Sequence, residues 1–334
     1  MIHLERMIDR LVQNGIVQNL AVRIGSGDRV VYDTFRGRVN DRTLFDMASV
    51  TKIMATTSLA LIALDRGLLQ PEETVSRFYP TDKPLTIRHL LTHTIGIGHK
   101  SLNRLGNTPE NIGEVILAIP SDISIGTDVL YSCPGFILLA KILERIFGKK
   151  LDQAFEELVA GPLGLTDTVF LPKERENIIN ANLETEKKGI VNDYNCQFLK
   201  GVAGNAGLFS NLSDVTKYVQ FLFRRGEPLF AEETFSMAVQ NYTGSMSESR
   251  GLGFLYVDPR YTQTGGLFPT GSIGHCGHTG QSVFVDLRSG LYVIILSDAT
   301  VSTIRKYGSE HYDEVMELRR LLHEAIKKDL NERG

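Results

Sequence analysis

Hydrophobic and polar positions predict β-strands near both ends of the chain. Residues 20–24 and 29–32 are rich in apolar and β-branched residues and flank a Gly-Ser-Gly-Asp turn, so they predict a β-hairpin. Residues 282–286 and 291–296, which are again β-branched and aromatic, predict a second hairpin. Because strand signals lie at both ends, we expect one sheet built from both termini.

Helical patterns lie outside these strands. Apolar residues recur at helical spacing over residues 3–14. Near the other end, Val315, Leu318, Leu322 and Ile326 share one helical face. We therefore expect a helix at each terminus, packed against the sheet.

The middle of the chain, from about residue 70 to 230, carries a mostly helical pattern. Its clearest runs are residues 136–147 and 215–223, where apolar residues recur every 3.6 positions or so. The economical arrangement is an α+β fold, with an antiparallel sheet flanked by terminal helices and an inserted, mostly helical domain. A cleft between two such parts is a common place for a site. The predicted domains are residues 1–70 with 235–334, and residues 71–234.

Composition excludes several classes of protein. With 334 residues and 42% hydrophobic content, the chain can bury a sizeable core. The net charge of −3, without a basic stripe, argues against a nucleic-acid partner.

Three cysteines are an odd number, which favours free thiols in a reducing compartment over a disulfide framework. The apolar run 53–64 is too short to span a bilayer. We expect a cytoplasmic protein; a trimmed secreted form is the alternative.

The most informative stretch surrounds Ser49 and Lys52. Asp46 is a suitable N-cap and Gly67 a suitable stop, so a helix over residues 47–66 is predicted. Its middle carries no charged residue, which is typical of a helix buried on all sides. The two polar residues are three positions apart, so their Cβ atoms lie about 5–6 Å apart on one face.

That placement suits acyl transfer. A serine hydroxyl is a weak nucleophile and needs an adjacent base. With a pKa near 10.4, roughly one lysine in 2,500 is neutral at pH 7, but burial can lower that pKa by about 3–5 units. We therefore expect Ser49 as nucleophile and Lys52 as a base with a lowered pKa. Ser-x-x-Lys is a weak pattern by itself. The apolar residues around Lys52 strengthen the catalytic interpretation, because a lysine with only a structural role is usually exposed to solvent.

Two further segments carry candidate chemistry. Tyr131 directly precedes the helical run 136–147, so its phenol could relay protons in a cleft, although a packing role is the commoner fate of a lone tyrosine. In residues 274–281, Gly280 would let a substrate backbone approach a strand closely. The backbone N–H of Gln281 could join that of Ser49 as an oxyanion hole, and His278 could contact a polar or anionic substrate group.

Residues 274–281 also allow other interpretations. The simplest is a glycine-rich turn before a strand. A zinc site made of His275, Cys276 and His278 is a second, weakened by the lack of a carboxylate cluster nearby. A Cys276–His278 nucleophile pair is less favoured still, because residues so close on one strand rarely meet well.

The order Ser49-Val-Thr-Lys52, Tyr131-Ser-Cys133 and His278-Thr279-Gly280 resembles the β-lactamase-related serine hydrolases. This broad group includes class C β-lactamases, penicillin-binding proteins, esterases and D-amino-acid peptidases. The resemblance implies an α/β sandwich with an inserted helical domain. It implies Ser49 as nucleophile, Lys52 and Tyr131 as proton-transfer partners, and the N–H groups of Ser49 and Gln281 as oxyanion donors. It extends to residues 90–96, 161–168 and 202–210.

Two positions depart from the usual pattern of that group. Cys133 stands where Asn is usual, and a thiol is a poor donor and acceptor for positioning an amide substrate. His278 stands where many relatives have Lys, and a histidine is only partly charged at pH 7. A demand for a substrate carboxylate is therefore less secure, and no acidic residue is assigned as deacylation base.

We predict a serine hydrolase that acts on an ester or amide through a Ser49 acyl-enzyme, with a small molecule as its partner and without metal or cofactor. A penicillin-binding D,D-peptidase or β-lactamase is the first alternative. A catalytically silent sensor module that keeps the fold is the second, supported in the sequence by Cys133 alone. No oligomeric state is assigned.

Overall fold

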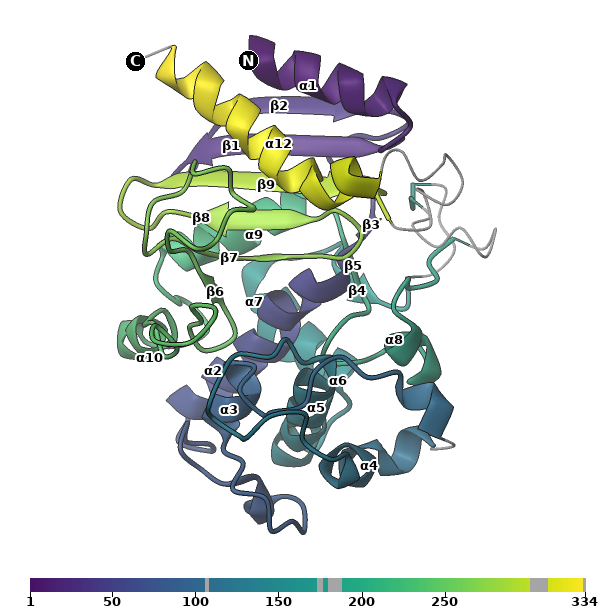
Figure 1. Ribbon diagram of the computed structural model, residues 1–334, viewed down its shortest axis with the longest axis vertical. Helices are drawn as coiled ribbons and strands as arrows, with labels where there is room; N and C mark the ends of the chain where they lie inside the picture. Colours follow the sequence, from purple (N-terminus) through teal and green to yellow (C-terminus); the bar gives the residue numbers. More distant parts are fainter. Residues whose placement is uncertain (106–107, 173–176, 180–187, 301–311, 333–334) are drawn as a thin grey trace.

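The computed structural model describes residues 1–105, 108–172, 177–179, 188–300 and 312–332. Its largest sheet has six antiparallel strands in the order β2-β1-β9-β8-β7-β6 (Figure 1). Both predicted hairpins are confirmed, as β1–β2 and β8–β9, and β1 pairs with β9 along its whole length. The two ends of the chain therefore form one sheet. Its strands are β1 Leu20–Ser26, β2 Arg29–Arg36, β6 Leu255–Tyr256, β7 Ile273–Cys276, β8 Ser282–Val285 and β9 Leu291–Ser297.

Alternation along the strands divides their side chains between two cores. On β9, Val293 and Ile295 join the core under the terminal helices, whereas Tyr292, Ile294 and Leu296 join the core shared with the helical part. A strand places successive side chains on opposite faces, so a strand that is apolar throughout must be covered on both. The sheet is accordingly a middle layer.

The terminal helices α1 (Ile2–Gln13) and α12 (Tyr312–Asn331) cover one face of the sheet (Figure 1). Leu318, Leu322 and Ile326 of α12 are buried in the core on that side, as their helical spacing predicts. The predicted fourth member of the stripe, Val315, lies outside the residues whose side chains are described.

The other face of the sheet packs against the helical part of the chain. The predicted runs 136–147 and 215–223 lie within α5 and α9, and the predicted α+β class is confirmed. A small sheet in the order β3-β5-β4 joins the strand just before Ser49 to this part. The remaining elements are β3 Phe45–Asp46, β4 Val169–Phe170, β5 Leu208–Ser210, α2 Ser58–Asp65, α3 Ile87–Leu91, α4 Ile112–Ala118, α5 Cys133–Phe147, α6 Leu151–Phe155, α7 Gly161–Leu163, α8 Tyr194–Phe198, α9 Leu212–Phe223 and α10 Glu232–Ala238.

The segment that carries Ser49 is helical over the predicted length but not uniformly α-helical. It runs as a 3₁₀ turn at Ala48–Val50, a π-helical stretch at Lys52–Thr57, and α2. Short π-helical stretches within helices often occur at functional sites. The predicted stop is confirmed, because Gly67 follows the last turn with a φ of +67°.

The predicted capping by Asp46 is confirmed in its hydrogen bond to Ala48, although the N-cap position is held by Met47. Asp46 lies in β3, two residues before the helical turn. Its buried carboxylate accepts the N–H of Ala48 at 2.8 Å and that of Asn192 at 2.6 Å. It therefore ties the turn before Ser49 to a distant loop, and Ala48 is held at a φ of +45°, in the left-handed region. Sequence pattern cannot show this, because the second partner is 146 residues away.

Among the described residues, Ala48–Asp65 is the single helical stretch long and apolar enough to cross a membrane, judged by length and composition. Inside the structure, 89% of this stretch is buried. Its apolar character is therefore matched by packing against the rest of the protein.

His323 of α12 makes stability depend on pH. The side chain is fully buried between Phe268 and Phe284, and burial lowers its pKa from 6.5 to about 4. Between pH 6.5 and about 4, His323 is therefore protonated in the unfolded chain and neutral in the folded protein. This contribution to stability is complete above pH 6.5 and is lost as the pH falls towards 4. A depression of this size corresponds to about 3 kcal/mol.

We expect His323→Leu to remove that part of the pH dependence, measured as the free energy of urea unfolding at pH 7.5 and pH 4.5. The wild-type protein should lose more stability over this interval than the variant. Parallel pH profiles for the two proteins would contradict the assignment.

Candidate active site

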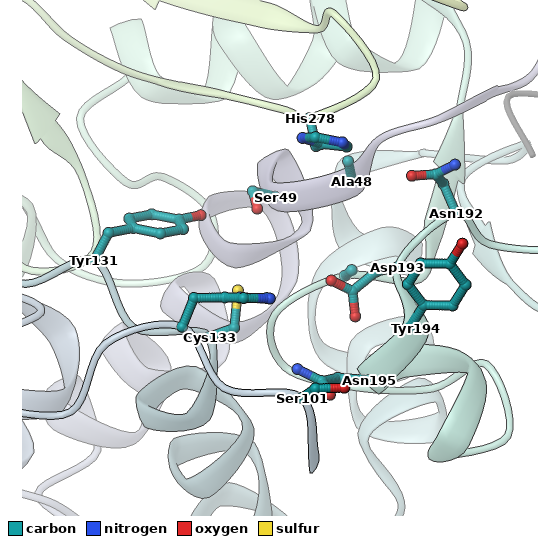
Figure 2. Close-up of a pocket in the computed structure, with 12 residues that line it drawn as sticks. Ala48, Ser49, Ser101, Tyr131, Cys133, Asn192, Asp193, Tyr194, Asn195 and His278 are labelled. Atoms are coloured by element: carbon teal, nitrogen blue, oxygen red, sulfur yellow. The ribbon is translucent and has the colours of Figure 1, made fainter. Parts of the chain in front are cut away.

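A pocket of about 350 Å³ opens where the nucleophile segment, the start of α5 and the loop before α8 meet (Figure 2). Four residues predicted from the sequence line it: Ser49, Tyr131, Cys133 and His278. Lys52 lies next to it and is fully buried. The complete lining is Ala48, Ser49, His99, Ser101, Tyr131, Cys133, Asn192, Asp193, Tyr194, Asn195, Ala206 and His278.

Lys52 is the hub of the polar contacts beside the pocket. Its Nζ donates to Ser49 Oγ at 2.9 Å, which agrees with the predicted shared helix face. It also donates to the backbone carbonyl of Asn205 at 3.0 Å and lies 3.6 Å from Cys133 Sγ. Asn205 was not anticipated from the sequence. Its carbonyl holds the lysine from the side of the loop before β5.

The expectation of a lowered pKa for Lys52 is wrong. Burial does act to lower it, but the neighbouring Cys133 and Tyr131 raise the pKa above its usual value. The ammonium form is therefore the resting state at neutral pH. Burial alone would favour a neutral lysine; a partner that can carry a negative charge reverses the balance.

Cys133 is that partner. Burial acts to raise the pKa of its thiol, but Lys52 and a hydrogen bond from His99 lower it below its usual value. The same hydrogen bond raises the pKa of His99. Cys133 and Lys52 thus lie side by side next to Ser49, and each shifts the pKa of the other towards its charged form. A thiolate is a far better acceptor than a thiol, so the proximity of Lys52 makes Cys133 a stronger acceptor.

Tyr131 lies on the other side of Ser49, with its hydroxyl turned towards that residue (Figure 2). Lys52 Nζ lies 4.9 Å from the centroid of its ring, and the ring of His93 stacks on it at 4.5 Å. Burial raises the pKa of Tyr131, whereas Lys52 acts to lower it. The phenol is therefore protonated at rest and can act as a donor.

His93 sets the position of Tyr131 and was not singled out by sequence. Its Nδ1 accepts the N–H of Ser132 at 3.0 Å, and the Ser132 hydroxyl accepts the N–H of Gly135 to cap α5. Burial lowers the pKa of His93 well below its usual value, so the imidazole is neutral and Nδ1 is free to accept. The residue thereby fixes the turn that places Tyr131 and Cys133 beside Lys52.

Thr279, Gly280 and Gln281 lie behind the pocket wall. Thr279 Oγ1 lies 2.9 Å from the carbonyl of Asp46, and Gln281 Nε2 donates to the same carbonyl at 2.6 Å and to that of Ser297 at 3.0 Å. These contacts join the turn between β7 and β8 to the strand before Ser49. The oxyanion role of the Gln281 backbone stays a prediction.

Packing accounts for the glycine at position 280. It has a φ of +88°, and an added Cβ would lie 2.1 Å from Ser297 Oγ. Any side chain would therefore both strain the backbone and collide with β9. A close approach of substrate at this residue stays a prediction.

His278 projects from the same turn into the wall of the pocket (Figure 2). Desolvation of the ring and the nearby charge of Arg319 lower its pKa below the usual 6.5. The imidazole is therefore mostly neutral at pH 7 and gives the pocket no fixed positive charge at this point.

The donor atoms considered for zinc have other partners. Cys276 Sγ lies 3.2 Å from the hydroxyl of Tyr261, and His275 Nδ1 lies 2.7 Å from the carbonyl of Cys276. His278 faces the pocket instead. Among the described residues, His3, Asp329 and Glu332 are the one group whose ligand atoms converge, and none of the three lines the pocket.

The loop before α8 supplies residues that the sequence did not point to. Asp193 is the N-cap of α8, where its Oδ1 accepts the N–H of Cys196 at 2.7 Å. It also lines the pocket. An Asp before a short helix is a recognisable cap, but only the tertiary structure brings it opposite Ser49.

Comparisons with known proteins agree with this geometry. The family model described as Beta-lactamase matches residues 4–315. The chain is 29% identical to the "Putative D-alanyl-D-alanine carboxypeptidase" of Escherichia coli (strain K12), covering 78% of this chain and 70% of that protein. It is 28% identical to Esterase EstB of Burkholderia gladioli, covering 78% of each. Among solved structures it resembles "EstCE1, a hydrolase with promiscuous acyltransferase activity", with a TM-score of 0.75, 22% identity, and coverage of 96% and 97%.

The thiolate character of Cys133 is testable by alkylation. At pH 7 we expect iodoacetamide to modify Cys133 well before Cys196, whose pKa burial raises far above its usual value. Peptide mass spectrometry over a time course gives both rates. Lys52→Met should slow the modification of Cys133, because the stabilising charge is lost. Equal rates for the two cysteines would contradict the ion pair.

Proposed function

Because the chain belongs to the beta-lactamase family, whose members are serine hydrolases, we propose that it hydrolyses esters or small amides through an acyl-enzyme on Ser49. The observation that carries the proposal is the 2.9 Å hydrogen bond between Ser49 Oγ, in the wall of the pocket, and the buried Nζ of Lys52. A serine held in this way lies beside an amine that can take its proton once Lys52 is neutral.

The Lys52–Cys133 pair offers a route to a neutral base. A proton moved from Lys52 Nζ to Cys133 Sγ, across 3.6 Å, converts ammonium and thiolate into amine and thiol. The amine then takes the proton of Ser49 as its oxygen attacks the substrate carbonyl carbon. The tetrahedral oxyanion would be received by the N–H groups of Ser49 and Gln281.

Collapse of that intermediate releases the alcohol or amine. Tyr131 gives its proton to the leaving group and regains one from Lys52, which becomes neutral again. Water then takes the place of the leaving group, and its proton passes through Tyr131 to Lys52. When the acyl bond breaks, Lys52 returns this proton to Ser49, and Cys133 gives its own back to Lys52. The cycle needs no carboxylate base.

Two features favour an ester without a carboxylate near the scissile bond. Cys133 provides no amide group to position the carbonyl of a peptide substrate. The mostly neutral His278 provides no fixed cation for a substrate carboxylate. Relatives of this family include a protein named as an esterase, which supports the same preference.

We expect Ser49→Ala to lower hydrolysis of p-nitrophenyl acetate and butyrate by about 10³-fold or more, since loss of a nucleophile removes the covalent route. The change is measured as kcat/KM by absorbance. Intact-mass analysis should show an acetyl adduct on the wild-type protein that is absent from the variant. Equal rates in the two proteins, with equal thermal stability, would overturn the proposal.

A penicillin-binding D,D-peptidase or β-lactamase is the second candidate, favoured by the name of the Escherichia coli relative. The substrates of such an enzyme carry a carboxylate, so their binding would depend on a positive charge at His278. Because the pKa of His278 lies below 6.5, that charge develops only as the pH falls below this value.

We therefore expect acylation by a fluorescent penicillin, relative to hydrolysis of p-nitrophenyl acetate, to rise as the pH falls from 7.5 to 5.5. His278→Lys should raise the ratio about tenfold at pH 7.5 and remove its pH dependence, because the lysine is charged throughout. A labelled band on a denaturing gel gives the acylation rate. An unchanged ratio in the variant would show that this position does not contact the carboxylate.

A further inference from the structure

We propose that Asp193 forms a subsite for a protonated amine on the acyl part of the substrate, so that the preferred substrates are esters or small amides of amino acids with a free amino group. The proposal rests on the hydrolase function proposed above and names its substrate class.

One carboxylate oxygen of Asp193 is free to receive such a group. Oδ1 caps α8, whereas Oδ2 accepts no hydrogen bond and lies within 4 Å of no Lys or Arg nitrogen among the described residues. Figure 2 shows the carboxylate turned towards the interior of the pocket, on the side of Ser49 and Cys133. A carboxylate in a pocket wall, fixed by one bond to a helix N-terminus, is already oriented for a second donor.

The other charged groups at the pocket have partners of their own. Lys52 donates to Cys133, and both Cys133 and Asp193 act to raise the pKa of Lys52 and of His99. The amide of Asn195 is likewise used, because it accepts the N–H of Leu102 and donates to the carbonyl of Lys100, both at 2.8 Å. None of these contacts occupies Oδ2 of Asp193, so that oxygen can accept a hydrogen bond from a substrate cation.

The position of Tyr131 decides which part of the substrate meets Asp193. In Figure 2, Ser49 lies between Tyr131 and Asp193. Because Tyr131 protonates the leaving group in the proposed mechanism, that group leaves on its side. The acyl group then extends to the opposite side, towards Asp193, within a pocket that the small side chains of Ala48 and Ala206 also line. A substrate carboxylate placed there would be repelled.

The experiment compares alanine methyl ester, as both enantiomers, with methyl isobutyrate, in which a methyl group replaces the ammonium. N-acetylalanine methyl ester is a second uncharged substrate. Rates are followed by pH-stat for the wild type, Ser49→Ala and Asp193→Asn. Asparagine is a good N-cap, so Asp193→Asn removes the charge and keeps an acceptor for Cys196 N–H. Glu110→Gln, at an exposed carboxylate outside the pocket, is the control for net charge.

We expect Asp193→Asn to lower kcat/KM for one enantiomer of alanine methyl ester by about 10- to 100-fold, mainly through KM, as loss of a charged hydrogen bond would. Rates on methyl isobutyrate and N-acetylalanine methyl ester should stay within about twofold, and Glu110→Gln should change nothing. Equal losses on charged and uncharged substrates, or no loss on either, would overturn the subsite while leaving the hydrolase intact. If the wild type acts on none of these esters, or Ser49→Ala is as active, both proposals fall.

Discussion

The candidate site depends on one buried positive charge. Lys52 has no access to water, so its ammonium must be stabilised by Ser49 Oγ, the carbonyl of Asn205 and the sulfur of Cys133. A buried charge without partners would cost several kcal/mol. These three groups come from different parts of the chain, and the lysine therefore fixes where the nucleophile segment, α5 and the loop before β5 meet. Loss of any one partner would alter both the local packing and the protonation of the lysine.

A second set of contacts holds the nucleophile against the large sheet. Thr279 and Gln281 bond to the carbonyl of Asp46, whose carboxylate in turn holds the N–H of Ala48 and of Asn192. The backbone at Ala48 is in a conformation that costs free energy for a residue with a side chain. Contacts on both sides of this residue maintain it, and they present Ser49 at the pocket rather than inside the core.

The proposed chemistry depends on the residue at position 133. An asparagine there would give the buried lysine a neutral neighbour. Cys133 instead acts to raise the pKa of Lys52, and in the proposed mechanism proton transfer between the two produces the neutral amine. His278 also leaves its side of the pocket without a fixed positive charge. Its imidazole is mostly neutral at pH 7, whereas a lysine at this position would be charged. Cys133 and His278 together support the proposed preference for small esters over substrates that need a fixed cation.

Local pattern in the sequence determined the two hairpins, the terminal helices, the helical stretch after Asp46 and the pairing of Ser49 with Lys52. These features depend on residues within a few positions of one another, where periodicity and spacing decide which face a side chain occupies. The order of the three motifs also indicated Tyr131, Cys133 and His278, which the fold does bring to one pocket. The tertiary structure alone decided the place of His93, His99, Asp193 and Asn205, since each meets the site from a separate segment. It also decided the direction of the pKa shift of Lys52, because that direction depends on which charged groups surround the amine, and burial by itself would have given the opposite sign.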